Sequence, residues 1–399
     1  MVLVINAGSS SLKYQLIDMR NEEVLARGLC ERIGIGGSIT HKTDKGKTQY
    51  EADFPTHKEA FRELIKLLTG GELAVISSLG EIKAVGHRAV QGGEKYSASV
   101  LVTEETLAGV EQCSDLAPLH NPANIMGIRA CMEVLDKSVP QVMVFDTAFH
   151  QTMPPHAYIF PIPYELYEKH RIRRYGFHGT SHRFVSARLS EILGKPLEEL
   201  KVITCHLGNG SSITAIDGGK SVDTTMGLTP LDGISMGTRS GSIDPAIVTY
   251  LMDKENLTYK EVNDLLNKKS GYLGVSGLTS DMRDLQAAAD GGNERAKLAM
   301  DIMRYQLRKY IGSFAAAMGG VDVVVFTGGI GENDAYARAA ACEGLGFMGI
   351  TLDEQINAGC RSTETEISAL GSKVKVFVIP TNEELLIARD TKVVANIGK

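Results

Sequence analysis

Apolar runs separated by amphipathic segments divide the 399-residue chain into strands and helices. Short apolar or alternating runs are typical of strands, whereas apolar residues at every third or fourth position indicate helices. These patterns predict strands at 1–6, 12–18, 83–90, 141–146, 201–207, 212–217, 322–326 and 373–380. They predict helices over 55–79 and 104–137, with Pro122 breaking the second, and a helix that closes the chain. This alternation predicts an α/β fold.

The pattern of the first 18 residues returns about halfway along the chain. Each copy has an apolar strand, a turn of small and hydroxyl residues, and a second strand, at 1–18 and again at 201–217. This weak repeat suggests two related domains. A chance similarity between two short hairpins is the alternative. The stretch 153–163 holds four of the twelve prolines and is the expected crossing between the domains.

Composition and charge narrow the class of protein. Hydrophobic residues make up 43% of the chain and the net charge is −6, which excludes a disordered or fibrous protein. The mild negative charge argues against nucleic acid or an anionic membrane as a partner. The six cysteines show no metal-binding spacing, so we expect free thiols. The sequence has neither a signal-peptide pattern nor a long apolar run, so we expect no signal peptide and no membrane-spanning segment.

Three glycine-rich turns, each directly after a predicted strand, are the main candidates for chemistry. They lie at 7–11, 208–211 and 328–333. Such turns expose backbone N–H groups to an anion, and glycine lets the backbone approach phosphate oxygens closely. One turn alone is ordinary hairpin chemistry, but three, with Lys13 after the first, indicate a phosphorylated ligand. The motif GxGxxG at 344–349 follows a helical run instead of a strand, so it does not predict a dinucleotide site.

Two arginines in glycine-rich loops predict a second anion site. Arg88 ends a predicted strand, where open α/β sheets place their ligand crevice. Arg239 lies in the long loop 223–245, and long structured loops are usually functional. His178 and His182 are spaced like metal ligands on a helix, but Gly179 argues against a regular helix, so we expect a hydrogen-bonding role. Asp146 ends a buried strand, and capping the next helix is its ordinary alternative role.

At these residues the sequence resembles the acetate kinase (acetokinase) family. The resemblance rests on motifs that run from residue 6 to residue 384, namely 6–13, 87–93, 146–150, 175–182, 206–210, 223–245, 328–333 and 381–384. It implies the fold shared by sugar kinases, Hsp70 and actin, which is RNase H-like and duplicated. Each domain would contain a mixed five-stranded sheet, and a nucleotide cleft would lie between the domains. The implied domains are 1–150 completed by the helix 385–399, and 151–384.

The resemblance also implies an activity, namely reversible transfer of the γ-phosphoryl group of ATP to acetate, in line, giving acetyl phosphate and ADP. It implies Mg²⁺, with Mn²⁺ able to substitute, and a cytoplasmic homodimer. The implied catalytic residues are Arg88, Asp146, His178 and Arg239, and the implied metal site contains Asn6 and Glu383. The acetate methyl group would contact Val90, Leu119, Phe177 and Pro230. The implied nucleotide site comprises Lys13, His206, Leu207, Gly208, Asn209, Gly210, Asp281, Met282, Arg283, Gly329, Ile330, Gly331, Glu332 and Asn333.

Asp146 needs a separate hypothesis, because the family is often given an acid or base at this position. Acetate is already ionised at pH 7, so a general base has no proton to remove. We therefore expect Asp146 to orient Arg88, Arg239 or a metal-bound water.

Two alternatives stay open. One is a propionate kinase, or another short-chain carboxylate kinase with this fold. The other is an ATPase of the actin or Hsp70 kind, which has no use for the paired Arg88 and Arg239.

Overall fold

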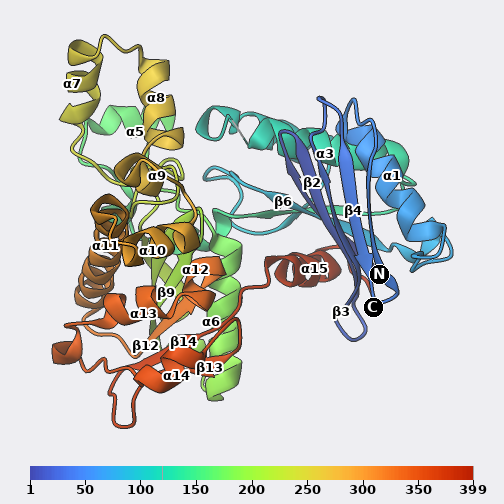
Figure 1. Cartoon of the computed structure of the whole chain (residues 1–399). Coiled ribbons are helices and arrows are strands. Elements are labelled where there is room, and N and C mark those ends of the chain that lie inside the picture. Colours follow the sequence, from blue (N-terminus) through green and yellow to red (C-terminus); the bar gives the residue numbers. More distant parts are fainter. Residues whose placement is uncertain (119, 399) are drawn as a thin grey trace. The chain divides into compact units, whose positions relative to one another are not determined.

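A computed structural model describes residues 1–118 and 120–398 and divides the chain into two compact units (Figure 1). The N-terminal unit consists of Met1–Gln151 and Asn382–Lys399, and the C-terminal unit of Thr152–Thr381. Each unit contains one mixed sheet with helices on its faces, so the α/β class is confirmed. Among the helices of the described residues, none combines the length and apolar character needed to cross a bilayer.

The sheet of the N-terminal unit has eight strands in the order β5-β4-β3-β2-β1-β6-β8-β7. They are β1 Val2–Gly8, β2 Ser11–Asp18, β3 Glu23–Glu31, β4 Ser38–Thr43, β5 Gly46–Glu51, β6 Ala84–Ala89, β7 Val100–Leu101 and β8 Gln141–Phe145. The helices of this unit are α1 His57–Thr69, α2 Glu104–Glu111, α3 Asn121–Val134 and α15 Glu383–Val394.

The sheet of the C-terminal unit has six strands in the order β11-β10-β9-β12-β14-β13. They are β9 Lys201–Leu207, β10 Ser211–Asp217, β11 Lys220–Thr224, β12 Val323–Thr327, β13 Thr365–Glu366 and β14 Lys375–Val378. The helices are α4 Pro155–Tyr158, α5 Tyr164–His170, α6 Gly179–Leu193, α7 Ala246–Lys254, α8 Tyr259–Lys268, α9 Gly271–Ser276, α10 Met282–Asp290, α11 Glu294–Met318, α12 Gly328–Asn333, α13 Ala335–Cys342 and α14 Glu354–Gly359.

The two sheets share a five-strand arrangement, although neither has the five strands expected in total. In β3-β2-β1-β6-β8 the first three strands pair antiparallel, and β6 and β8 follow in parallel. The run β11-β10-β9-β12-β14 has the same order and directions. The predicted repeat therefore extends well beyond the two hairpins. The prediction missed β3, β4 and β5 in their mostly polar stretch, β11, which lies partly in the predicted loop 223–245, and β7 and β13, which have only two residues each.

Alternation along β1 explains why this sheet is covered on both faces. Leu3 and Ile5 belong to one core cluster with side chains of α1 and α3, whereas Val2 and Val4 pack with Ile387 of α15. Successive strand residues point to opposite faces, so one short apolar strand contacts helices on both sides. The closing helix α15 thereby belongs to the N-terminal unit, although it comes last in the sequence.

Several predicted boundaries were wrong, each for a local reason. The helix expected over 55–79 is α1, which begins at His57 after the N-cap Thr56 and ends at Thr69 before the C-cap Gly70; Thr56 and Glu59 form a capping box. The segment 104–137 contains two helices, and Pro122 lies in the first turn of α3, where its missing N–H costs no hydrogen bond. Residues 328–333 form the helix α12 and not a turn. Gly179 does not prevent a helix, because α6 begins there.

Candidate functional site

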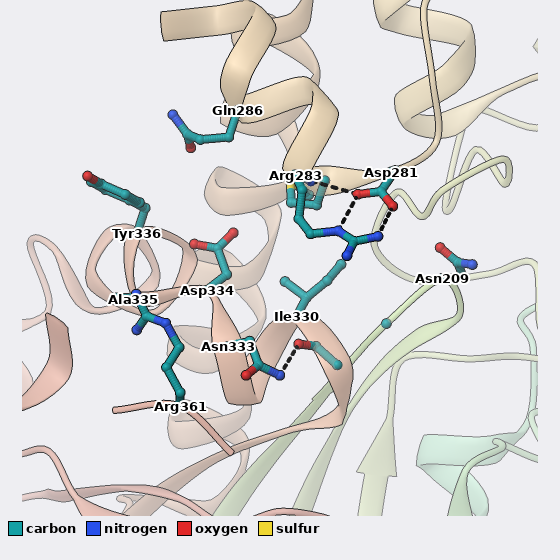
Figure 2. Close-up of a pocket in the computed structure, with 13 residues that line it drawn as sticks. Asn209, Asp281, Arg283, Gln286, Ile330, Asn333, Asp334, Ala335, Tyr336 and Arg361 are labelled. Atoms are coloured by element: carbon teal, nitrogen blue, oxygen red, sulfur yellow. Dashed lines mark hydrogen bonds and ion pairs between the residues drawn. The ribbon is translucent and has the colours of Figure 1, made fainter. Parts of the chain in front are cut away.

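A cavity of about 690 Å³ lies at the N-terminal ends of three helices of the C-terminal unit (Figure 2). Its wall comes from the turn after β9, the start of α10, the helix α12, the start of α13, and Arg361. Eight of the predicted nucleotide residues line it: Gly208, Asn209, Asp281, Met282, Arg283, Gly329, Ile330 and Asn333. Helix N-termini and a glycine turn supply N–H groups to an anion, and this volume is typical of a small-molecule site.

The remaining wall residues were missed by the sequence reasoning. They are Gln286, Asp334, Ala335, Tyr336 and Arg361. Gln286 lies three residues after Arg283 on α10, so helical spacing could have indicated it. Arg361 lies in a separate segment with no motif, and only the tertiary structure brings it to the cavity (Figure 2).

Asp281 and Arg283 form an ion pair at the N-terminus of α10. Asp281 caps this helix by accepting a hydrogen bond from the backbone N–H of Arg283 at 2.9 Å. Its carboxylate also binds the Arg283 guanidinium, with Oδ2–Nη2 at 2.6 Å. These side-chain and backbone hydrogen bonds lower the pKa of Asp281 to about 2. The pair therefore keeps both charges on the cavity wall at neutral pH.

Six predicted nucleotide residues do not belong to the cavity wall: Lys13, which lies in the N-terminal unit, and His206, Leu207, Gly210, Gly331 and Glu332. Glu332 has another role, because its Oε1 accepts hydrogen bonds from the N–H groups of Gly328 at 3.0 Å and Thr381 at 3.2 Å. Gly328 has φ of +76°, and a Cβ there would lie 2.7 Å from the Leu207 carbonyl oxygen. The left-handed Gly328 therefore lets β12 pass directly into α12, and Glu332 fixes that junction.

Histidines gather beside the turn after β9. His178, with φ of +55°, precedes α6, and its ring stacks on His206 with the ring centroids 4.3 Å apart. Ser212 Oγ lies 2.9 Å from His178 Nδ1 and 2.7 Å from His182 Nε2. The two histidines thus share a hydroxyl, and the described residues contain no group of three or more His, Cys, Asp or Glu side chains fit for a metal. A left-handed non-glycine residue beside stacked rings is typical of a functional position.

Arg239 approaches the same turn. A Cβ at Gly210 would lie 3.3 Å from His178 Nε2 and 3.5 Å from Arg239 Nη1, so both side chains approach this glycine. Arg239 Nη1 donates to the Pro230 carbonyl oxygen at 3.1 Å. Burial lowers the pKa of Arg239, because the guanidinium loses solvation inside the loop. Residues 225–245 contain neither helix nor strand, as predicted for most of this loop.

The N-terminal unit holds the other predicted arginine. Arg88 Nη2 donates to Asp146 Oδ2 at 2.5 Å, and the Asp146 side chain is fully buried whereas that of Arg88 is 24% exposed. Burial lowers the pKa of Arg88, but the carboxylates of Asp146, Glu383 and Glu384 raise it by more than burial lowers it. The pKa of Arg88 therefore lies above its ordinary value. Asp146 therefore contacts Arg88, one of the partners expected for it.

The glycine-rich turn 7–11 of this unit lies beside the start of α15. Lys13 and Asn6 are opposite each other on β2 and β1, and Lys13 Nζ donates to Glu384 Oε1 at 2.5 Å. Glu383 and Glu384 form the first turn of α15, which Asn382 caps. Val90 is buried directly after β6. Leu119 lies outside the described residues. Phe177 is buried in the C-terminal unit, where Pro230 is half-buried.

The sequence and the fold were compared with known proteins. The acetokinase family model matches residues 1–389. The acetate kinase of Methanosarcina thermophila is 59% identical over 393 residues, covering 98% of this chain and 96% of that protein. The structure of Porphyromonas gingivalis acetate kinase is similar with a TM-score of 0.95 and 50% identity, covering 98% and 99% of the two chains. A propionate kinase from Francisella tularensis has a TM-score of 0.92 and 43% identity, with the same coverage. Over residues 1–389, the chain therefore belongs to the acetokinase family.

Proposed function

We propose that this protein is an acetate kinase, which reversibly transfers the γ-phosphoryl group of ATP to acetate and forms acetyl phosphate and ADP. One observation carries the proposal. Gly208 and Asn209 line the cavity, and the next residue, Gly210, lies against both His178 and Arg239. A nucleoside in the cavity can direct its phosphates along this turn toward an imidazole and a guanidinium. We infer a carboxylate as the phosphoryl acceptor from the relatives named above, which are acetate kinases.

The C-terminal unit would bind ATP and stabilise the phosphoryl group in transfer. Asp281, Arg283 and the first turn of α12 would enclose the adenosine, and the turn 206–210 would hold the phosphates. Phosphoryl transfer needs little covalent help from the protein, because its transition state is stabilised mainly by positioning and by charge on the equatorial oxygens. His178 and Arg239 fit that task, since their side chains converge on Gly210 from two different segments.

The N-terminal unit would position the acceptor. Arg88 is suited to grip the carboxylate, because a guanidinium binds two carboxylate oxygens at once. Asp146 would orient Arg88 and would not remove a proton. Its hydrogen bonds to Nη2 and, at 3.3 Å, to Nε of Arg88 support this role. The methyl group of acetate would contact Val90, Phe177 and Pro230.

Mg²⁺ fits the residues of this chain. Asn6 and Glu383 offer an amide and a carboxylate oxygen, and Mg²⁺ is usually held by one or two protein oxygens together with substrate phosphates. When bound, the ion neutralises charge on the phosphate oxygens. Glu383 also contributes to the field that keeps Arg88 charged, so the same carboxylate would serve both substrates.

Propionate is the second candidate acceptor, because the Francisella tularensis propionate kinase shares the fold at 43% identity. One additional methylene changes the binding free energy by only about 1–3 kcal/mol, so the kcat/KM values for the two substrates should differ by about 10- to 200-fold at most. We propose acetate as the preferred acceptor, because relatives with 57–60% sequence identity are named acetate kinases. We further propose two actin-like domains, a cytoplasmic location and a homodimer, the last of which light scattering on the purified chain would test.

The deciding experiment measures phosphoryl transfer from Mg-ATP with acetate, propionate, butyrate and glycerol, and traps acyl phosphate with hydroxylamine. We expect a hydroxamate that forms fastest with acetate. A faster reaction with propionate would replace the substrate but keep the chemistry. ATP turnover that does not depend on any acceptor would overturn the kinase proposal and favour an actin- or Hsp70-like ATPase.

A further inference from the structure

The parallel ladder between β1 and β6 stops short of the loop 90–93 that follows β6, which we call the acceptor loop. Its pairs are Val2↔Ala84, Leu3↔Val85, Val4↔Gly86 and Ile5↔His87. On its other side β6 stays paired beyond this point, because the Asp146 N–H donates to the Ala89 carbonyl oxygen at 2.9 Å. If the register continued, Asn6 would face Arg88, the Ala7 N–H would bond to the Arg88 carbonyl, and the hydrogen bond after that would run from the Val90 N–H to the Ala7 carbonyl.

A buried side-chain amide occupies the place of that bond. Asn124 of α3 accepts from the Val90 N–H through Oδ1 at 3.1 Å and donates through Nδ2 to the Ala7 carbonyl oxygen at 2.9 Å. Only 4% of Asn124 is exposed, so neither backbone group has water as a substitute partner. The chemistry of the two partners also fixes which end of the amide is oxygen and which is nitrogen.

The helix is shaped to bring this amide between the strands. Gly127 lies one turn after Asn124, and a Cβ there would come within 2.4 Å of the Ala7 Cβ, so only glycine allows this approach. Asn121, at the start of α3, provides a useful contrast. It binds the N–H of Gln91 at 3.1 Å and the Gln91 carbonyl oxygen at 2.9 Å, and it donates to the Val110 carbonyl oxygen of α2 at 3.2 Å, so its hydrogen bonds reach the acceptor loop and α2 but not the turn 7–11.

We propose that Asn124 is a positioning residue that acts as a spacer between β1 and β6, holding their carboxyl ends apart so that Asn6 and Arg88 reach separate substrates. A side-chain amide inserted between two strands replaces one direct backbone hydrogen bond by two, one to each strand. It thereby keeps the strands from pairing at that point. The strand ends that it separates carry the proposed metal ligand and the proposed carboxylate ligand. Asn has the one side chain with a donor and an acceptor at this reach, since Asp lacks the donor and Leu lacks both.

This inference rests on the proposed function for its kinetic test but not for its structural test. We expect N124A to let Val90 N–H bond directly to the Ala7 carbonyl, at about 2.9 Å in a crystal structure. Arg88 would then shift toward β1, and a displacement of about 1 Å costs on the order of 100-fold in rate. The kcat should therefore fall by about that factor. N124L, which retains volume but has neither hydrogen-bonding group, should also lose kcat.

N121A is the matched control, because it removes a buried amide of the same helix that binds only one of the two loops. It should raise the KM for acetate, leave the KM for ATP within about threefold of wild type, and keep most of kcat. An N124A enzyme whose kcat matches that of N121A would overturn the proposal, as would an N124A crystal structure in which the strands stay apart. If the variants do not fold, hydrogen exchange in the wild type decides: a Val90 N–H that exchanges faster than the N–H groups of β6 contradicts the spacer.

A wild-type enzyme that makes no acyl phosphate would refute the proposed function alone. The N124A structure would still show whether the two strands close.

Discussion

Replacing Asp146 by Asn tests how the acceptor arginine is held. The substitution keeps the size and one acceptor oxygen of the side chain but removes its charge. Asp146 is fully buried and its Oδ2 lies 2.5 Å from Arg88 Nη2. In the variant the amide group would have to present either its oxygen or its NH₂ group to this nitrogen. Since Arg88 also has an N–H at Nε directed to Oδ1, one of the two contacts would become donor against donor.

The size of the effect follows from the burial of the pair. A hydrogen bond between charged groups contributes about 1.5–3 kcal/mol, and the removal of one partner of a buried pair costs about 3–5 kcal/mol of stability. The Arg88 side chain is 24% exposed, so solvent and the nearby Glu383 and Glu384 compensate in part. We therefore expect D146N to lower the free energy of unfolding by about 3 kcal/mol, the lower end of the range for a buried pair. If the lost contact also orients Arg88 in the transition state, about 1.5–3 kcal/mol corresponds to about 10- to 150-fold in kcat/KM for acetate.

The assay measures kcat and KM for acetate and for ATP by the hydroxamate method, with thermal unfolding of the same samples. D146N should lower kcat/KM for acetate by the stated factor and leave the KM for ATP nearly unchanged. The shape of the pH–rate profile should not change, because an orienting residue transfers no proton.

Two results would refute this reasoning. Near wild-type kcat/KM in a folded D146N enzyme would show that the ion pair has no orienting role. A pH–rate profile that loses a limb in D146N would show that Asp146 takes part in proton transfer.

Three further predictions follow from the structure. Gly210→Ala places a methyl group 3.3 Å from His178 Nε2, so kcat should fall by about 10-fold or more while the melting temperature changes little, and an unchanged kcat would contradict the convergence on this turn. Gly328→Ala should lower the melting temperature by several degrees, because φ is +76° and the new Cβ would meet backbone at 2.7 Å, whereas Gly329→Ala, with open space around it, should not, and equal melting temperatures would disprove the strain. Burial lowers the pKa of His87 to about 4, although its hydrogen bond to Gln141 raises it, so the folded chain binds fewer protons here than the unfolded chain. Stability should therefore be fully present above about pH 6.5 and should be lost as the pH falls toward 4, by up to about 3 kcal/mol. His87→Gln should flatten that slope in denaturant titrations at several pH values, and a slope equal to that of wild type would exclude His87 as its source.

Local patterns were sufficient for most of the strands and for the predicted repeat. The apolar runs of β1, β9 and β12 are short and dense because these strands lie inside the sheets, and each glycine-rich segment directly after such a run was recognisable as a ligand candidate. The outer strands β3, β4 and β5 were missed because one-sided burial leaves polar residues at about half of the positions. The glycines of α12 indicated a turn, but these residues form a helix, whose first N–H, that of Gly328, donates to the Glu332 side chain.

The sequence by itself indicated the class of fold, the repeated hairpin, the glycine-rich turns after strands and the two arginines, since each of these is encoded by residues adjacent in the chain. The tertiary structure decided which distant side chains meet. It placed Arg361 and Tyr336 on the cavity wall with Asp281, and it placed the Asn124 amide between Ala7 and Val90. Such contacts join segments that lie from about 30 to more than 100 residues apart, and periodicity, which describes only neighbours within a few turns, holds no information about them.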